Sequence, residues 1–270
     1  MKLGEQQLLS LERDGFLVLP DLFSADEIEL LNSRLPALLS DNTSANIIEK
    51  ASGEVRTAMG LHLRDEIFAK LARHPRLLEP ARQIRSAPLY IQQVKVNVKA
   101  AFSGEVWQWH YDFATHHKDD GVPEPLALNL HVFLNDINEF NGPLYFIPGS
   151  HKFGAHRAFH DISSTSYPLW VVDEVVVREM IANAEAIDPA RAIVSATGKR
   201  GTGLIFFDTL VHGSPNNLSP WDRSVFSVIV NPVSNASTRN TRPDFKHHRD
   251  FTDIVMAADD CLTGALVSGL

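Results

Sequence analysis

The chain has 270 residues, of which 44% are hydrophobic, and its formal net charge at pH 7 is -8. This length suits one domain with a packed core, and the acidic balance argues against a nucleic-acid partner or an anionic membrane surface. The single cysteine, Cys261, excludes an intrachain disulfide and a cysteine-based metal site. Since the first residues lack a signal-peptide layout and no apolar run approaches the roughly 18 residues of a membrane span, we expect a cytoplasmic protein.

Residues 1–87 are predicted to be mainly helical. Ser24 and Glu27 have capping-box spacing ahead of Ile28 and a series of leucines, which indicates the start of a helix. Further helices are expected over residues 66–73, ending near Pro75, and over residues 76–85. Residues 15–20 are expected to form a short buried strand.

From residue 88 onward the hydrophobic pattern changes to period two, which is typical of β-strands. In residues 89–99 one face carries Gln93, Lys95 and Asn97 while the other is mostly aliphatic, which fits a solvent-facing strand or a cavity wall equally well. In residues 126–134 an aliphatic face lies opposite one that carries Asn129 and His131. That second pattern favours a strand whose outer side packs on helices and whose inner side lines a cavity.

The rest of the chain adds short strands and one poorly patterned stretch. An Asn141-Gly-Pro turn leads into residues 144–148, and strands are expected over 202–208, 211–213 and 224–230. We interpret residues 151–197, with one helix at 172–184, as an insertion over the mouth of a site, and residues 233–270 as a polar tail. Helices followed by many short strands predict a mainly β fold with flanking helices in a single domain, 1–270. Its core, residues 88–232, is expected to be a jelly-roll or cupin-like double-stranded β-helix packed against the N-terminal helices.

Three His-x-Asp pairs are candidates for a metal site: His110/Asp112, His117/Asp119 and His248/Asp250. Only the first lies in an apolar, aromatic segment, residues 106–113, where period-two alternation would place His110 and Asp112 on one strand face. The second lies in a charged run expected to be a loop, and the third has no histidine after it. His212 follows the first pair. A buried histidine bonded to a nearby carboxylate is the alternative interpretation of this spacing.

Two imidazoles and one carboxylate, from His110, Asp112 and His212, suit a non-haem Fe(II) site that keeps three coordination positions open. Arg223, eleven residues after His212, could hold the far carboxylate of 2-oxoglutarate in a bidentate pair, although a surface ion pair is the alternative. This set predicts Fe(II) and 2-oxoglutarate, with O2, as cofactors. It indicates a dioxygenase that hydroxylates an unactivated C–H bond and releases succinate and CO2.

The chain also carries a series of ordered motifs. In sequence order they are Val55-Arg-Thr57, His74-Pro-Arg76, Gln93-Val-Lys-Val-Asn97, Trp107-Gln-Trp-His-Tyr-Asp112, Asp120-Gly-Val-Pro123, Asn141-Gly-Pro143, Ile147-Pro-Gly-Ser-His151 and Pro220-Trp-Asp-Arg223. With these motifs the chain resembles the phytanoyl-CoA dioxygenase superfamily, and most of all the bacterial branch that contains ectoine hydroxylase and proline trans-4-hydroxylase. The resemblance implies an iron- and 2-oxoglutarate-dependent hydroxylase of a small amino or imino acid.

The resemblance also implies roles for individual residues. It assigns iron binding to His110, Asp112 and His212 and cosubstrate binding to Arg223, Asn97 and Ser214. Gln93 and Thr115 match positions near the substrate in ectoine hydroxylases. Two departures, His116 where both relatives carry tryptophan and Ser227 where ectoine hydroxylases carry phenylalanine, argue against ectoine itself and leave a proline-like or aliphatic amino acid as the expected substrate.

A small zwitterionic substrate needs charged or polar partners. Lys95 is a candidate partner for its carboxylate, and His116 or His131 could contact it. The alternatives are a solvated or structural lysine, a surface histidine in a loop for His116, and a core histidine for His131.

Two other function classes share some of these features. A zinc-type metallohydrolase or isomerase explains the three ligands but leaves Arg223 unused. A non-catalytic barrel that binds a small ligand gives no reason for the ligands and the arginine together.

Overall fold

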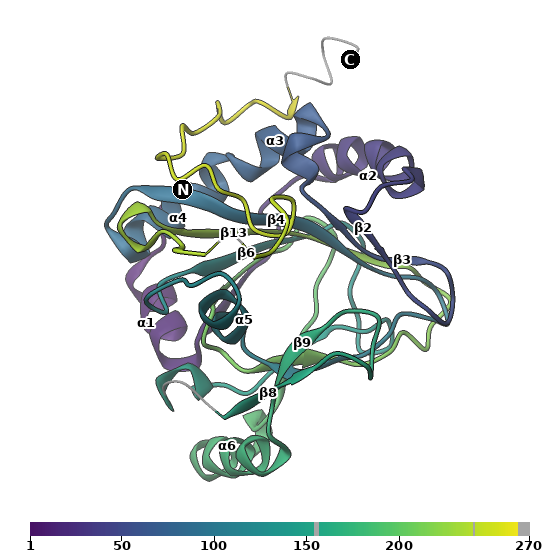
Figure 1. The fold of residues 1–270 in the computed structure, drawn as a ribbon. Coiled ribbons are helices and arrows are strands. Elements are labelled where there is room, and N and C mark those ends of the chain that lie inside the picture. Colours follow the sequence, from purple (N-terminus) through teal and green to yellow (C-terminus); the bar gives the residue numbers. More distant parts are fainter. Residues whose placement is uncertain (154–156, 240, 264–270) are drawn as a thin grey trace.

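The computed structural model describes residues 1–153, 157–239 and 241–263. Its described strands form two sheets that lie face to face (Figure 1). The major sheet has seven strands in the order β1-β11-β6-β13-β4-β3-β2, and the minor sheet has six in the order β10-β7-β12-β5-β9-β8. Neighbouring strands pair antiparallel throughout. The predicted jelly-roll type of fold, mainly β with flanking helices, is confirmed.

Most strands lie where the period-two pattern predicted them. The major sheet consists of β1 (Phe16–Leu19), β2 (Asn46–Ile48), β3 (Val55–Met59), β4 (Leu89–Lys99), β6 (Leu128–Phe133), β11 (Gly203–Phe207) and β13 (Arg223–Pro232). The minor sheet consists of β5 (Trp107–His110), β7 (Leu144–Phe146), β8 (Ala158–Asp161), β9 (Leu169–Val172), β10 (Val194–Ala196) and β12 (His212–Ser214). Strands β2 and β3 fall in the part expected to be mainly helical, and they extend the edge of the major sheet by pairing with β4.

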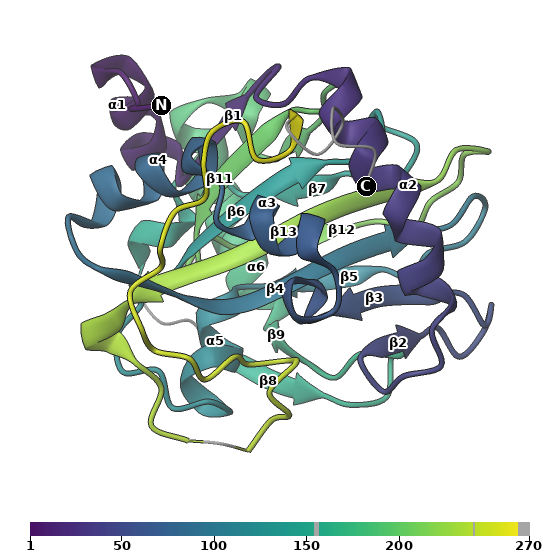
Figure 2. The same ribbon diagram turned by 90° about the horizontal axis from the view of Figure 1, so that it is seen from above.

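Helices cover the outer face of the major sheet (Figure 2). They are α1 (Glu5–Asp14), α2 (Ala25–Ser40), α3 (Glu66–Ala72) and α4 (Pro75–Arg85), close to the predicted positions. Their buried apolar residues form one core cluster with the outward side chains of β6 and β13, such as Leu128, Leu130 and Val228. The aliphatic face predicted for β6 therefore packs on helices, and its polar face is left to point between the sheets. None of the described helices is long and apolar enough to span a membrane.

The start of α2 shows the capping box that the sequence predicted. The Ser24 side chain accepts from the backbone N–H of Glu27, and the Ser24 N–H donates to Glu27 Oε2 at 2.8 Å. Glu27 is only 2% exposed, and its other oxygen, Oε1, lies 2.6 Å from Arg76 Nη2 on α4. The same carboxylate thus caps one helix and joins it to another.

The stretch expected as an insertion, residues 151–197, contributes to the minor sheet itself. Strand β9 pairs with β5 at His110 and Val171, and β8 adds the edge. The predicted helix is α6 (Glu174–Ile187), whose buried side chains Val177 and Met180 pack below this sheet (Figure 1). Residues 154–156 of the expected insertion lie outside the described residues.

The tail after residue 232 runs back along β4. Apart from a short 3-10 turn at Val233–Asn235 it has no regular structure within the described residues, and its last part, 264–270, lies outside them. Backbone N–H groups of His248 and Ile254 donate to the carbonyls of Gln92 and Leu89, both at 2.8 Å. These bonds hold the tail beside the cavity described below.

Replacing Glu27 with alanine should destabilise the fold. The change removes the acceptor of the Ser24 N–H and leaves Arg76 without its buried partner, so we expect the free energy of unfolding to fall by about 3 kcal/mol. Urea denaturation followed by circular dichroism measures this. Glu29→Ala is the matched control, because its side chain is 72% exposed and its loss should cost about 0.5 kcal/mol or less. Equal losses for the two variants would contradict the assignment.

Candidate active site

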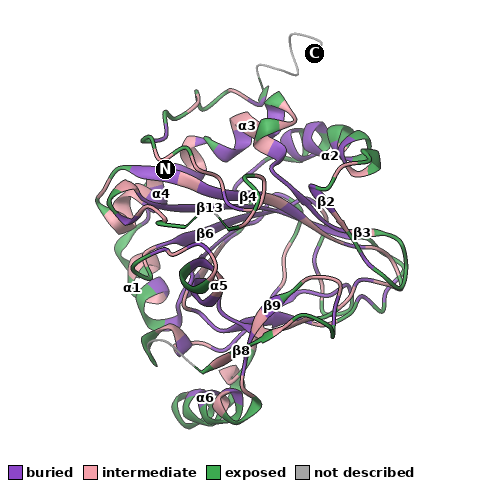
Figure 3. Cartoon of the chain, in the orientation of Figure 1, coloured by how far each residue is buried: buried purple, intermediate pink, exposed green. Residues whose placement is uncertain are grey.

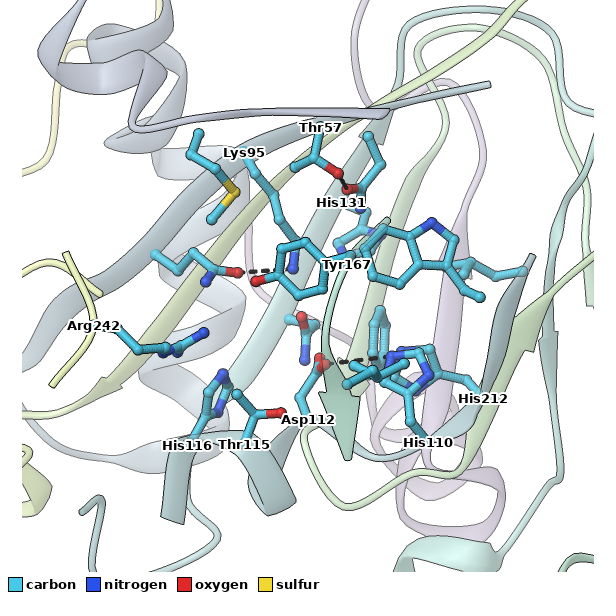
Figure 4. Close-up of a pocket in the computed structure, with 18 of the residues that line it drawn as sticks. Thr57, Lys95, His110, Asp112, Thr115, His116, His131, Tyr167, His212 and Arg242 are labelled. Atoms are coloured by element: carbon cyan, nitrogen blue, oxygen red, sulfur yellow. Dashed lines mark hydrogen bonds and ion pairs between the residues drawn. The ribbon is translucent and has the colours of Figure 1, made fainter. Parts of the chain in front are cut away.

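Two histidines from distant parts of the chain meet in the minor sheet. His110 ends β5, His212 begins β12, and the two are register partners across the antiparallel pair. Asp112 follows at the first position of helix α5 (Asp112–Lys118). One ligand atom from each of the three residues lies within 4.8 Å of the others, and His110 Nε2 is 3.7 Å from Asp112 Oδ1 (Figure 4). The structure therefore brings three metal-ligand atoms around one point.

The expectation that His110 and Asp112 share one strand is wrong. Strand β5 stops at His110, and Tyr111, in an extended conformation, is the N-cap of α5. The carboxylate approaches the histidines because the chain turns from strand to helix between them. Period-two alternation singled out the pair that the structure brings together with His212, but for the wrong structural reason.

Backbone carbonyls orient both imidazoles. His110 Nδ1 lies 2.7 Å from the Gln108 carbonyl, and His212 Nδ1 lies 2.9 Å from the Leu210 carbonyl. Because a carbonyl can only accept, each Nδ1 carries the hydrogen and each Nε2 keeps its lone pair. This is the arrangement in which outer hydrogen bonds fix histidines for metal binding.

The protonation states also suit a metal. Burial and the neighbouring His212 lower the pKa of His110 to about 3, and burial lowers the pKa of His212. Burial would raise the pKa of Asp112, but His212, Lys95 and His110 together hold it below its usual value. At neutral pH the site therefore offers two neutral imidazoles and one carboxylate, the forms that bind a divalent cation.

The other two His-x-Asp pairs are engaged elsewhere. His117 Nδ1 contacts the Val122 carbonyl, and Asp119 accepts from Trp170 Nε1 at 3.0 Å. At the third pair, Asp250 accepts from the hydroxyl of Thr252. Among the described residues, His110, Asp112 and His212 are the group of three that could hold a metal.

The three ligands open into a cavity between the sheets. Several parts of the fold contribute to its wall. The two sheets contribute Gln93, Lys95 and Asn97 from β4, Asn129 and His131 from β6, and Arg223 from β13. Thr115 and His116 come from α5, Tyr167 and Leu169 from the stretch 151–197, and Arg242 from the tail. Strands of both sheets are largely buried around it (Figure 3). The polar face of β4 is thus a cavity wall and not a solvent-facing surface. Of the candidate residues, Ser214 and Ser227 are not part of the lining.

Arg223 is a buried guanidinium without an anion. It is 2% exposed, and no carboxylate among the described residues pairs with it. Its Nε is buried without a hydrogen-bond partner, and burial lowers the pKa of Arg223 to about 10. A buried, unpaired charge is costly, so this residue is suited to an anion that enters the cavity. The surface ion pair considered for Arg223 is wrong.

The two other residues expected near the cosubstrate differ in their contacts. Asn97 lines the cavity, and its Oδ1 accepts from Thr57 Oγ1 at 3.0 Å. Ser214 is buried, and its hydroxyl donates to the Gly142 carbonyl at 2.9 Å. Its register partner is the lining residue Trp107.

Three polar side chains near the cavity have no described partner. Both amide atoms of Asn129, both ring nitrogens of His131 and the hydroxyl of Ser227 are buried and unbonded. Ser227 lies between Lys95 and His131 in the sheet register. Burial holds the pKa of His131 well below its usual value, so this ring is neutral.

His116 is part of the cavity wall. It lies in helix α5, in a run expected to be a loop, and it is 3% exposed, so the surface histidine considered for this position is wrong. Burial lowers the pKa of His116 to about 4, which keeps the ring neutral at physiological pH.

Two wall residues, Tyr167 and Arg242, were not candidates from the sequence. Tyr167 lies in the poorly patterned stretch, and its ring is 5.2 Å from that of Trp107. Arg242 lies in the polar tail, where no periodicity indicates a contact. One signal was present: the Asp120-Gly-Val-Pro motif contains a carboxylate that is buried in the structure and pairs with Arg242.

Comparisons with known proteins agree on one family. The profile described as Phytanoyl-CoA dioxygenase (PhyH) matches residues 11–225. The L-proline trans-4-hydroxylase of Streptomyces griseoviridis is 34% identical over 262 residues, 93% of this chain and 94% of that protein. The ectoine dioxygenase of Bordetella parapertussis is 36% identical, covering 86% of this chain and 77% of its own. The crystal structure of EctD from S. alaskensis with 2-oxoglutarate and 5-hydroxyectoine has a TM-score of 0.80 at 32% identity, over 95% of this chain and 86% of its own.

Removal of the carboxylate should abolish metal binding. We expect Asp112→Ala to weaken Fe(II) affinity by more than about 100-fold, because even the loss of outer contacts to ligands costs about 10–100-fold. Anaerobic titration with Fe(II), followed by calorimetry, measures this. Asp250→Ala, at the exposed aspartate of the third pair, is the control and should bind Fe(II) like the parent protein. Unchanged affinity in Asp112→Ala would place the metal elsewhere.

Proposed function

This chain belongs to the phytanoyl-CoA dioxygenase family and is an iron- and 2-oxoglutarate-dependent dioxygenase; we propose that it hydroxylates an unactivated C–H bond of a small amino or imino acid. One observation carries the site assignment: three metal-ligand atoms and an unpaired buried guanidinium share one cavity. The zinc hydrolase alternative explains the ligands alone and leaves Arg223 without a role.

We assign the iron to His110, Asp112 and His212. Ligands from one side leave three coordination positions toward the cavity, enough for a chelating 2-oxoglutarate and O2. When bound, these three together supply the oxidising chemistry that hydroxylates the substrate and yields succinate and CO2. The work left to the protein is to hold the reacting C–H bond at the metal and to exclude water.

We assign the far carboxylate of 2-oxoglutarate to Arg223. A guanidinium can hold a carboxylate through two parallel hydrogen bonds, and burial makes such a pair strong. Asn97 lies on β4, opposite Val225 of the paired strand β13, and Val225 is two residues from Arg223. The side-chain amide of Asn97 can therefore donate a hydrogen bond to the same cosubstrate. Ser214 supports the same region through its bond to Gly142.

We assign the substrate to the remaining wall. Lys95 is the proposed partner of its carboxylate, and its Nζ donates to Gln93 Oε1 at 2.7 Å. Thr115 and the neutral rings of His116 and His131 offer uncharged contacts, with Ser227 behind them. His116 and Ser227 stand where ectoine hydroxylases carry tryptophan and phenylalanine, so this site lacks those two rings although Trp107, Tyr167 and Phe206 still line the cavity. The loss of the two rings supports a proline-like or aliphatic amino acid as substrate. A reducing compartment preserves Fe(II), so we propose a cytoplasmic location.

Turnover should depend on an amino acid. Protein reconstituted anaerobically with Fe(II) is mixed with 2-oxoglutarate, O2 and each member of a panel that contains L-proline and the aliphatic amino acids. We expect at least one to raise succinate formation well above the rate without amino acid, because bound substrate couples O2 use to hydroxylation. Asp112→Ala is the control and should give no stimulation. Iron-loaded protein that none of the panel stimulates would reject the proposed substrate class.

Loss of the guanidinium should affect the cosubstrate alone. In Arg223→Met we expect the KM for 2-oxoglutarate to rise by about 30-fold or more, the usual cost of removing one partner of a buried charge pair. Arg223→Lys should recover part of this, since lysine keeps the charge but loses the planar fork. Arg200→Met, at a half-exposed arginine, is the control. A rise in KM for the amino acid with no change for 2-oxoglutarate would contradict the assignment.

A further inference from the structure

The two sheets are joined at one edge of the barrel by a side chain. The major sheet ends there in β4-β3-β2 and the minor sheet in β5-β9-β8, and within the described residues no strand pairs across from one sheet to the other. Glu105 lies in the loop between β4 and β5. Its carboxylate contacts Arg56 of β3 and Ser166, which lies three residues before β9 begins. Glu105 therefore bridges the two sheets at this edge.

Glu105, Arg56 and Ser166 together form a clamp. Glu105 Oε2 accepts from Arg56 Nη1 at 2.9 Å and from the backbone N–H of Ser166 at 2.7 Å, and Oε1 accepts from the Ser166 hydroxyl at 2.6 Å. Burial would raise the pKa of Glu105, but the bonds from Ser166 and the charge of Arg56 hold it below its usual value, so the carboxylate is ionised at neutral pH. Hydrogen bonds to an ionised group are shorter and stronger than neutral ones, so the clamp holds Ser166 firmly to β3.

Two aromatic rings of the cavity wall rest on the clamp. The guanidinium carbon of Arg56 lies 4.0 Å from the centre of the Trp107 ring. Tyr167 directly follows Ser166, and its ring centre is 5.2 Å from that of Trp107. Both rings line the cavity, and Figure 4 shows Tyr167 pointing into it. Glu105 thus fixes one ring through Arg56 and the other through Ser166.

The segment 162–168, which carries Tyr167, has few other attachments to the barrel. Within the described residues, its hydrogen bonds beyond the neighbouring strands β8 and β9 are made by Ser166, two to Glu105 and one from the backbone N–H of Lys50 at 2.7 Å. Residues 162–164 are exposed. Loss of the Glu105 carboxylate would leave one of these three bonds, and the segment would be free to move away from the cavity with Tyr167.

We propose that Glu105 is a positioning residue for the reaction, which keeps Tyr167 and Trp107 closed over the cavity. The proposal rests on the proposed function, in which the protein holds the reacting C–H bond at the metal and excludes water. With the clamp closed, the two rings shield the bound amino acid from solvent. With the clamp broken, 2-oxoglutarate and O2 still give succinate and CO2, but the C–H bond is less often in place. Turnovers that hydroxylate nothing then consume an external reductant, such as ascorbate, in place of the substrate.

Side-chain footprinting measures the closure without turnover. Metal-free protein is oxidised briefly by hydroxyl radicals, and mass spectrometry gives the oxidation rates of Trp107 and Tyr167. In Glu105→Gln we expect both rates to rise by about twofold or more, since a free segment exposes rings that are now only partly accessible. Ser166→Ala keeps the pair of Arg56 with Glu105, so it should raise the rate of Tyr167 alone. Trp221, which is 56% exposed, is the internal reference and should not change.

Controls separate loss of the clamp from loss of the fold. Glu54→Gln, at an exposed glutamate directly before β3, is the matched control for the carboxylate change and should oxidise like the parent protein. Ser163→Ala is the matched control for the hydroxyl change, because its backbone N–H keeps the bond to Asp161. The thermal unfolding midpoint of each variant is measured in parallel. Arg56 keeps Glu49 at 3.9 Å as a second partner in Glu105→Gln, and Ser166→Ala repeats the test on Tyr167 if that variant unfolds.

Product stoichiometry tests the consequence for the reaction. Protein loaded anaerobically with Fe(II) receives 2-oxoglutarate, O2, ascorbate and either L-proline or an aliphatic amino acid, and both succinate and hydroxylated amino acid are measured. In Glu105→Gln we expect the ratio of succinate to hydroxylated product to rise by about fivefold or more, the factor of one hydrogen bond, with the KM for 2-oxoglutarate within about twofold of the parent value. Glu105→Asp keeps both acceptor oxygens on a shorter side chain, so it should restore part of the coupling.

The outcomes separate this proposal from the proposed function. Unchanged oxidation rates of both rings in folded Glu105→Gln would overturn the clamp and leave the hydroxylase assignment intact. Faster oxidation with an unchanged product ratio would overturn the role of Glu105 in positioning. Faster oxidation in the variants, combined with a parent protein in which no amino acid raises succinate formation, would reject the hydroxylase and keep Glu105 as the residue that closes the cavity.

Discussion

The antiparallel pairing of β5 with β12 is the constraint on which the site depends. It sets His110 opposite His212, about a hundred residues apart in the chain, and the carbonyls of Gln108 and Leu210 fix both rings from behind. The third ligand, Asp112, is not placed by strand pairing. The chain turns into helix α5 directly after Tyr111, and this turn brings the Asp112 carboxylate to the two histidines. Sheet register and one helix start thus place three donors without help from a flexible loop.

Several charged and polar groups of the cavity wall have no partner among the described residues. Arg223 is buried and Lys95 is half-buried, and neither forms an ion pair with a carboxylate of the described residues. Neither polar atom of the Asn129 amide has a hydrogen-bond partner. Such groups cost stability in the ligand-free protein, and the packed helices on the major sheet offset that cost. Neutral histidines at positions 116 and 131 keep the space from becoming more positive, because burial holds the pKa of each ring below neutrality. The wall therefore offers two separate positions for an anion, one at Arg223 and one at Lys95.

Local signals in the sequence predicted much of the fold. The capping box at Ser24, the leucine spacing of α2 and the two-faced patterns of β4 and β6 each reflect a physical requirement that acts over a few residues. The same patterns indicated which polar residues face inward. Asp112 and His116 were misplaced because a short helix begins inside a segment that alternates like a strand. Strands β2 and β3 were not predicted, because a strand of three to five residues is too short to show a clear period-two pattern.

Contacts between distant segments could not be predicted from local sequence patterns. Tyr167 and Arg242 reach the cavity through pairing with Trp107 and Asp120, and neither partner is near in sequence. The location of Arg242 has a consequence for shortened forms of the protein. Because Arg242 lies on the tail and pairs with the buried Asp120, truncation of the chain before residue 242 would leave that carboxylate without its partner and remove part of the cavity wall.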